Sequence, residues 1–376
     1  MISSALSVSN IFLVPAYIAI MLATSSALAA AEIGESDTYP RVDGNVIFRL
    51  ANDSIYAAET SFARNSVFSK SKDYFGEMIA SPRVHFSERL SISSEIRLEG
   101  VRPPTEDRVF EDQGLFARKL FAEFSLSDHF SLHAGKFTPS FALASLVAPG
   151  MYGINFSKEI ELIERIGFGS EYIFDVGESG KHKLSVSTFF DDTSILSDSL
   201  GSRRGQKRLS DGGASNTESF ESFTVSLEGN EISWLPGFTY KIGYIHEARG
   251  EGDAADEDGF AVAAMQSFQL SDGTSLFLFG EVAPLWNFEG SADDIVYSSA
   301  GVLYQTGSWN MILTGTHRWR DLDDGRTYND YSLQTAAKHD FGDGISFEVA
   351  HEFIRDKNLN SRRVGFRLIR MLDLRQ

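Results

Sequence analysis

The sequence predicts an all-β fold, a transmembrane antiparallel up-and-down β-barrel of about 16 strands with long outer loops and short periplasmic turns. Three observations support this prediction. From Asp43 onward, apolar and polar residues alternate with a period of two. The connections between the alternating segments are short and long in turn. No segment after residue 31 approaches the roughly 20 continuous apolar residues of a membrane-spanning helix.

Residues 1–31 differ from the rest of the chain. They contain no Lys, Arg, Asp or Glu, and residues 11–21 form an apolar run that small residues follow. Ala27-Leu28-Ala29 or Ala29-Ala30-Ala31 would suit a signal-peptide cleavage site. A permanent membrane anchor is the alternative, but the apolar run is short for a spanning helix. We expect residues 1–31 to be a signal peptide and residues 32–376 to form one outer-membrane barrel.

The alternation is clear on the first predicted strand, where Val46, Phe48 and Leu50 alternate with Asn45 and Arg49. Side chains that are two residues apart lie on the same face of a strand, so one face is apolar and the other polar. The same pattern recurs in residues 77–86, 92–99, 119–126, 130–135, 184–191, 222–228, 238–244, 309–319, 345–353 and 363–368.

The connections predict how the strands are joined. The short ones are residues 87–90, 127–129, 177–182, 230–236, 271–274, 307–308 and 341–344. The long ones are residues 52–72, 101–113, 141–161, 193–218, 249–258, 287–293, 320–327 and 357–361. These seven short and eight long connections join about 16 strands, and an even number returns both termini to the periplasmic side.

A secreted β-sandwich or a soluble β-helix would also show alternation. Two features argue against them. The apolar faces carry little charge, and aromatic residues fall at strand ends, with Trp309 and Trp319 on one face and Tyr331 and Phe353 on neighbouring strands. This pattern is typical of the aromatic girdles of membrane barrels. Open sheet edges are costly in lipid, so we expect the sheet to close.

The composition excludes several function classes. The chain has no cysteine, which rules out disulfides and thiolate chemistry and suits an oxidising compartment. A formal net charge of −18 makes nucleic acid an unsuitable partner. The motifs of serine hydrolases, zinc proteases and P-loop enzymes are absent. Asp191 and Asp192 are adjacent on a strand, so their side chains point to opposite faces. We therefore expect no catalytic residue, no cofactor and no metal site.

The polar strand faces supply the candidate pore-lining residues, if they point into the barrel. The first and last strands must be neighbours in a closed barrel, so Arg49, Arg363 and Arg367 predict a local cationic wall. Rings of charge tune the ion preference of a channel. The alternative is that these charges only pair with one another across a water-filled interior. The candidates are Arg49, Arg83, Arg97, Lys119, Glu123, Arg165, Lys241, Arg318, Arg363 and Arg367.

Two charged segments of the predicted outer loops are candidate binding sites. Residues 203–208 (RRGQKR) form a dense basic run in the longest predicted outer loop. They either attract anions, including lipopolysaccharide phosphates, or form a solvated loop tip. Residues 251–258 are acidic and would either bind divalent cations between lipid head groups or simply be solvated.

The loop after residue 137 is unusually apolar for a connection, and it carries no charged residue between Lys136 and Lys158. A solvent-facing loop would be polar. We expect it to fold into the mouth of the barrel, with its apolar side chains against the inner wall. The candidate residues of this loop are Phe141, Leu146, Met151 and Tyr152.

Short motifs resemble those of known porins. Residues 133–141 (HAGKFTPSF) are similar to the end of a strand in Gram-negative porins of the phosphate-selective porin O/P-like group. Residues 164–167 (ERIG) and 189–193 (FFDDT) resemble an uncharacterised porin-like family of alphaproteobacteria. The resemblance implies a barrel, either a homotrimer or a monomer, in the outer membrane of a Gram-negative bacterium, in contact with membrane lipid and lipopolysaccharide.

The resemblance also implies a function. A porin is a passive diffusion channel for small hydrophilic solutes or ions, and its third long loop, about residues 141–160 here, would narrow the pore. A first alternative is a channel that is specific for phosphate, other anions or sugars. A second is a non-conducting barrel with a structural or adhesive role, in which the loops at 193–218 and 249–258 would bind partners.

Overall fold

The computed structural model describes residues 39–57, 70–104 and 106–375, so the predicted signal peptide lies outside the described residues. The described chain forms 16 long strands and two short ones of two residues each. None of its helices is long and apolar enough to cross a membrane. The strands are β1 Arg41–Ala57, β2 Lys70–His85, β3 Leu90–Gly100, β4 Arg108–Val109, β5 Gln113–Ser127, β6 Phe130–Phe137, β7 Arg165–Asp175, β8 Lys181–Asp191, β9 Leu200–Gly201, β10 Ser222–Asn230, β11 Phe238–Glu247, β12 Glu257–Ser271, β13 Thr274–Trp286, β14 Asp294–Thr306, β15 Trp309–Asp321, β16 Thr327–Gly342, β17 Ile345–Asp356 and β18 Leu359–Arg375.

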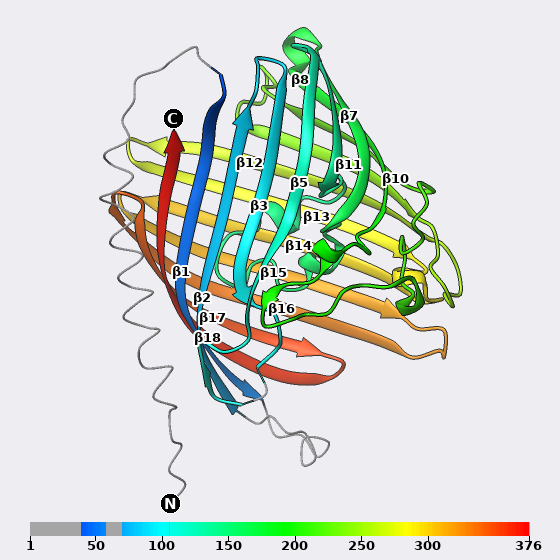
Figure 1. Cartoon of the computed structure of the whole chain (residues 1–376). Helices are drawn as coiled ribbons and strands as arrows, with labels where there is room; N and C mark the ends of the chain where they lie inside the picture. The colour runs from blue at the N-terminus through cyan, green and yellow to red at the C-terminus, as the bar shows by residue number, and fades with distance from the viewer. Residues whose placement is uncertain (1–38, 58–69, 105, 376) are drawn as a thin grey trace, which may run out of the picture.

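The sheet closes on itself. Each long strand is antiparallel to the next long strand in the chain, and β1 pairs with β18 from Asp43–Arg375 to Ala57–Ser361. Figure 1 shows the first strand, in blue, lying beside the last, in red. Closure pairs the main-chain groups that an open edge would leave without partners in lipid. The predicted 16-stranded antiparallel barrel is confirmed.

Among the described residues, the connections follow the predicted alternation except at the last long one. Of the loop predicted at residues 52–72, residues 52–57 belong to β1 and residues 70–72 to β2, and residues 58–69 lie outside the described residues. The sequence predicts a loop at residues 357–361, but only Lys357 and Asn358 lie between β17 and β18. Both residues have positive φ angles, 47° and 66°. Two such residues make a tight hairpin turn whose twist matches that of the flanking strands, and Asn tolerates this conformation well. The prediction of a long loop there is wrong.

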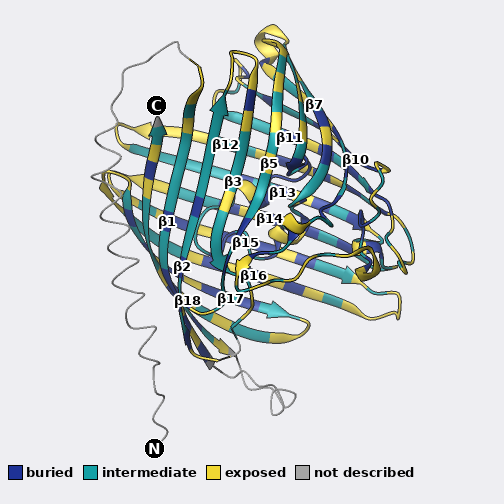
Figure 2. Cartoon of the chain, in the orientation of Figure 1, coloured by how far each residue is buried: buried dark blue, intermediate teal, exposed yellow. Residues whose placement is uncertain are grey.

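The outer wall of the barrel is apolar where it would contact lipid. On β15, Met311 and Leu313 are each 47% exposed, whereas Ile312 and Thr314 on the opposite face are buried. Figure 2 shows such bands of different exposure alternating along the strands. Exposed apolar side chains repeat on strand after strand, which in water would be a large aggregation-prone surface. In a membrane barrel this outward apolar band is the expected surface.

Aromatic rings form rows across neighbouring strands near both ends of the barrel. At the end with the long loops, rings of Phe223, Tyr244, Phe260 and Trp286 follow one another from β10 to β13, with centroids 5.0 to 6.2 Å apart. At the end with the short turns, Tyr172, Phe174, His182 and Tyr240 form a similar row. Girdles of aromatic residues mark the two boundaries between lipid and water in membrane barrels, and Tyr and Trp combine an apolar ring with a polar group there.

The connection between β6 and β7, residues 138–164, runs inside the barrel and is called the inner loop below. It contains two short helical segments, α2 (Ala144–Val147) and η2 (Ser157–Ile160). Its side chains Phe141, Phe156 and Ile160 are at most 5% exposed. They belong to one apolar core with wall residues Phe189, Ile245, Ala261, Ala283, Leu285, Ile295, Tyr297 and Ile354. The loop is apolar because it packs against residues of β8, β11, β12, β13, β14 and β17.

The apolar wall leads to a prediction about Leu313, which lies outward in the middle of β15. The Leu313→Arg variant should lose about 2–4 kcal/mol of unfolding free energy in lipid vesicles, because lipid cannot solvate a guanidinium. The measurement is a urea titration followed by tryptophan fluorescence. Val176→Arg is the control, since Val176 is 51% exposed but lies in a short turn between strands. Equal, small losses in both variants would contradict the membrane-facing assignment.

Candidate pore and its inner loop

Carboxylates of the wall hold the main chain of the inner loop. Glu281 on β13 accepts hydrogen bonds from the backbone N–H groups of Leu143 and Ala144, the latter at 3.0 Å. Glu348 on β17 accepts one from the N–H of Met151 at 2.7 Å. These two carboxylates are 5% and 1% exposed. A buried loop has many main-chain groups without secondary-structure partners, and the wall supplies those partners.

Side chains tie the same loop to other strands. Tyr152 donates a hydrogen bond to Asp53 of β1 at 2.9 Å, and Asn155 donates one to Glu352 of β17 at 2.9 Å. Glu159 accepts from Arg318 of β15 at 2.6 Å and from the hydroxyl of Tyr297 at 2.7 Å. The loop is therefore attached across the barrel interior and not only at its two ends.

Glycines allow the loop to approach the wall closely. A Cβ on Gly243 of β11 would lie 2.5 Å from the carbonyl oxygen of Phe141. Gly150 has a φ of +95°, and a Cβ there would lie 2.0 Å from Nε2 of Gln334. Any larger residue at either position would push the loop away from the wall.

An opening remains between the inner loop and the wall formed by β1, β2, β3, β5 and β18. This cavity has a volume of 650 Å³. Leu146, Met151 and Tyr152 face it from the loop, while Phe141 is 2% exposed and packs in the apolar core instead. Five of the sequence-predicted residues line this opening from the wall: Arg49, Arg97, Lys119, Arg363 and Arg367.

The other predicted wall residues lie elsewhere. Arg83 pairs with Glu123 at 3.7 Å, and neither residue lines the 650 Å³ opening. Lys241, 4% exposed, lines an adjoining cavity of 210 Å³, which shares Lys119, Ser145, Leu146 and Glu161 with the opening. Arg165 lines another, of 380 Å³, and pairs with Glu247 at 2.9 Å.

Arg318 is covered by the inner loop and acts as an anchor for it. Its side chain is 6% exposed and its guanidinium lies 4.1 Å from the centre of the Phe156 ring. Besides Glu159 it pairs with Asp330 at 2.9 Å and with Asp356 at 2.6 Å. Arg320 also pairs with Asp330 and Asp356, at 2.6 and 3.0 Å, so three carboxylates neutralise two neighbouring guanidinium groups.

Sequence reasoning missed Arg118. The register between β3 and β5 shifts between Glu95, which faces Lys119, and Ile96, which faces Ala117, so Arg118 is an extra residue in a β-bulge. A bulge breaks the period of two, and both Arg118 and Lys119 therefore line the opening. Arg118 pairs with Glu161 at the end of the inner loop. Nothing in the alternation of the sequence signals this bulge.

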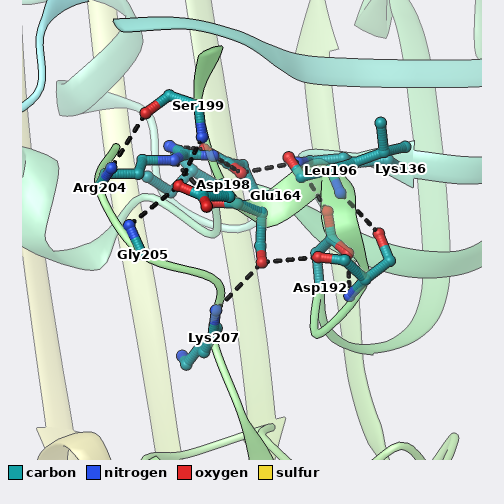
Figure 3. A network of polar contacts seen from close by, with 12 residues as sticks. Lys136, Glu164, Asp192, Leu196, Asp198, Ser199, Arg204, Gly205 and Lys207 are labelled. Carbon is teal, nitrogen blue, oxygen red and sulfur yellow. Dashed lines mark hydrogen bonds and ion pairs between the residues drawn. The ribbon is translucent and has the colours of Figure 1, made fainter. Parts of the chain in front are cut away.

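Residues of the basic run at 203–208 form ion pairs within the protein, and Figure 3 shows Arg204 in this network. Both terminal nitrogens of Arg204 donate to Glu164, at 2.7 and 2.6 Å, and Lys136 pairs with Glu164 and Asp192 at 2.7 Å each. Lys207 pairs with Asp191. The interpretation of this run as a solvated loop tip or as a free anion attractor is therefore wrong for Arg204 and Lys207.

The position of this network follows from the short β6. This strand ends at Phe137, where the chain turns inward. The first residues of β5 therefore have no partner from β6 on that side of the strand. Strand β9 covers that edge, with Leu200 and Gly201 opposite Leu115 and Gly114. An unpaired strand edge would be costly. The ion pairs hold the outer loop in the position where β9 pairs with the edge of β5.

The acidic segment at residues 251–258 also binds its own chain. Asp253 accepts hydrogen bonds from the N–H groups of Gly250 at 2.7 Å and Gly213 at 3.1 Å, and Asp256 accepts one from the N–H of Arg249. In the described ranges, no three acidic or His side chains are grouped so that they could hold a metal ion.

No protein-family model matches this chain, and no match was found among curated proteins. Solved structures do resemble it. The outer membrane channel DcaP of Acinetobacter baumannii matches 90% of this chain and 100% of its own, at 15% identity and a TM-score of 0.57. OprB of Pseudomonas putida matches 88% of this chain and 94% of its own, at 10% identity and a TM-score of 0.60. OmpF of Salmonella typhi matches 90% of this chain and 100% of its own, at 11% identity and a TM-score of 0.57.

The fold is that of the outer-membrane porins. This agrees with the apolar wall and with the predicted location in the outer membrane of a Gram-negative bacterium. The narrower resemblance to the porin O/P-like group or to the alphaproteobacterial family stays a prediction, because identities of 10 to 15% carry the fold alone.

The packing of the inner loop leads to a prediction about Phe141. The Phe141→Ala variant should lose about 3–5 kcal/mol of unfolding free energy, because it leaves a cavity in the apolar core. Leu146→Ala is the matched control: Leu146 lies on the same loop but is 57% exposed, so its loss should stay within about 0.5 kcal/mol. Urea titration in detergent micelles measures both. If the two variants unfold at the same urea concentration, the loop does not pack as described.

Proposed function

We propose that this protein is a passive diffusion channel of the outer membrane for small hydrophilic solutes or ions. The observation that carries the proposal is the 650 Å³ opening between the inner loop and the wall. Solutes would pass through this opening, and the inner loop, about residues 141–160, would narrow it. The predicted pore-lining function of the wall residues is part of the proposal.

Such a channel needs no chemical step. Its selectivity follows from the width of the narrowest region and from the charges that line it. The apolar side chains Leu146 and Met151 narrow the opening by bulk, and the charged wall opposite keeps it hydrated. The loop is attached to several strands, so the width is a property of the folded barrel and does not depend on a mobile gate.

Conductance in planar lipid bilayers tests the proposal. Ohmic openings support a diffusion channel. Saturable block by one solute, such as phosphate or a sugar, would support the substrate-specific alternative. Folded protein that never conducts would overturn the channel function and favour the structural or adhesive alternative. The homotrimer stays a prediction, which cross-linking of the purified protein in detergent tests.

The constriction leads to a prediction about Leu146. The Leu146→Trp variant should lower the single-channel conductance, because the larger ring enters the opening that Leu146 lines. A point substitution is better than removal of the loop, since removal would leave Glu281 and Glu348 without the N–H groups that satisfy them. Val176→Trp, in a turn away from the opening, is the control. Unchanged conductance in Leu146→Trp would show that the inner loop does not limit the flow.

A further inference from the structure

The charges around the opening are unequal in number. Of the described residues that line it, seven are Lys or Arg and four are Asp or Glu. The acidic ones are Asp53, Glu77, Glu95 and Glu161. The whole chain has the opposite balance, with a formal net charge of −18. The balance at the opening therefore results from how the fold distributes the charges.

The ion pairs between β17 and β18 are asymmetric in exposure. Arg363 lies 3.7 Å from Glu352, and their side chains are 29% and 0% exposed. Arg367 lies 2.8 Å from Glu348, and these side chains are 17% and 1% exposed. Each pair is neutral as a whole, but a passing solute meets the guanidinium and not the carboxylate.

The inner loop causes this asymmetry. Its Met151 N–H group donates to Glu348 and its Asn155 side chain donates to Glu352, so both carboxylates lie beneath the loop. The N–H groups of Leu143 and Ala144 cover Glu281 in the same way. The loop thus removes negative charge from the surface that a solute would meet.

The loop contributes two charged residues to the opening, Glu161, which pairs with Arg118, and Lys158. Lys158 is exposed, lines the opening and has no ion-pair partner among the described residues. Arg118 and Lys119 reach the same space from the bulge in β5. Guanidinium groups pair well with oxyanions such as carboxylate and phosphate because two N–H groups can bind two oxygens.

We propose that the opening prefers small anions over cations, and that the inner loop produces this preference by covering the carboxylates of the wall. This inference rests on the proposed channel function. The field of the lining charges acts over about 8 Å at 0.15 M ionic strength, which is comparable with the distance across a narrow opening.

The test is the permeability ratio of chloride to potassium, taken from the reversal potential of the full barrel in planar bilayers under a KCl gradient. The native protein should have a ratio above one. Lys158→Glu should lower it about twofold or more, because two units of charge change beside the path. Lys158 has no partner to lose, so this variant should fold normally. Arg326→Gln, in the outer turn between β15 and β16, is the control and should leave the ratio unchanged.

Arg363→Gln should also lower the ratio, but it leaves the buried Glu352 without its cation and so serves only as a second variant. A native ratio of one or less, or a ratio that Lys158→Glu does not change, would overturn the anion preference and leave the channel function in place. A folded barrel without any conductance would instead overturn the proposed function.

Discussion

The hydrogen bonds between the wall and the main chain of the inner loop are the constraint on which the interior of this barrel depends. A loop of residues 138–164 that leaves the sheet and enters the barrel has main-chain groups that must find partners. Glu281, Gln334 and Glu348 supply them from three strands. The apolar side of the loop then packs against β8, β11, β12, β13, β14 and β17, so the opening is displaced toward β1, β2, β3, β5 and β18.

This solution determines the electrostatics of the interior. A buried carboxylate is costly unless it is paired. Glu281 receives two N–H groups of the loop, while Glu348 and Glu352 each receive one hydrogen bond from the loop and pair with an arginine of β18. The carboxylates that hold the loop are consequently hidden, and the arginines that neutralise them stay at the edge of the opening. Loop position and pore charge are thus two results of one set of contacts, in a chain whose formal net charge is −18.

The entry of the loop into the barrel also leaves a gap in the sheet beside β5. Strand β6 ends at Phe137, and the exposed edge of β5 is covered by β9 from the next outer loop. The basic run at residues 203–208, which looked like a free loop tip, supplies Arg204 and Lys207 to the ion pairs that hold this cover in place. The positive charges of Arg204 and Lys207 therefore stabilise the barrel wall.

The sequence by itself determined the strands, the closure of the barrel and the inward direction of the apolar loop, because a period of two and an uncharged connection are local properties of the chain. It placed Arg49, Arg363 and Arg367 together, since the first and last strands must pair. It did not predict the tight turn at Lys357, the bulge that turns Arg118 inward, or the burial of Arg318. Only the tertiary structure decided which charges face the opening, because that depends on the register between strands and on which carboxylates a distant loop covers.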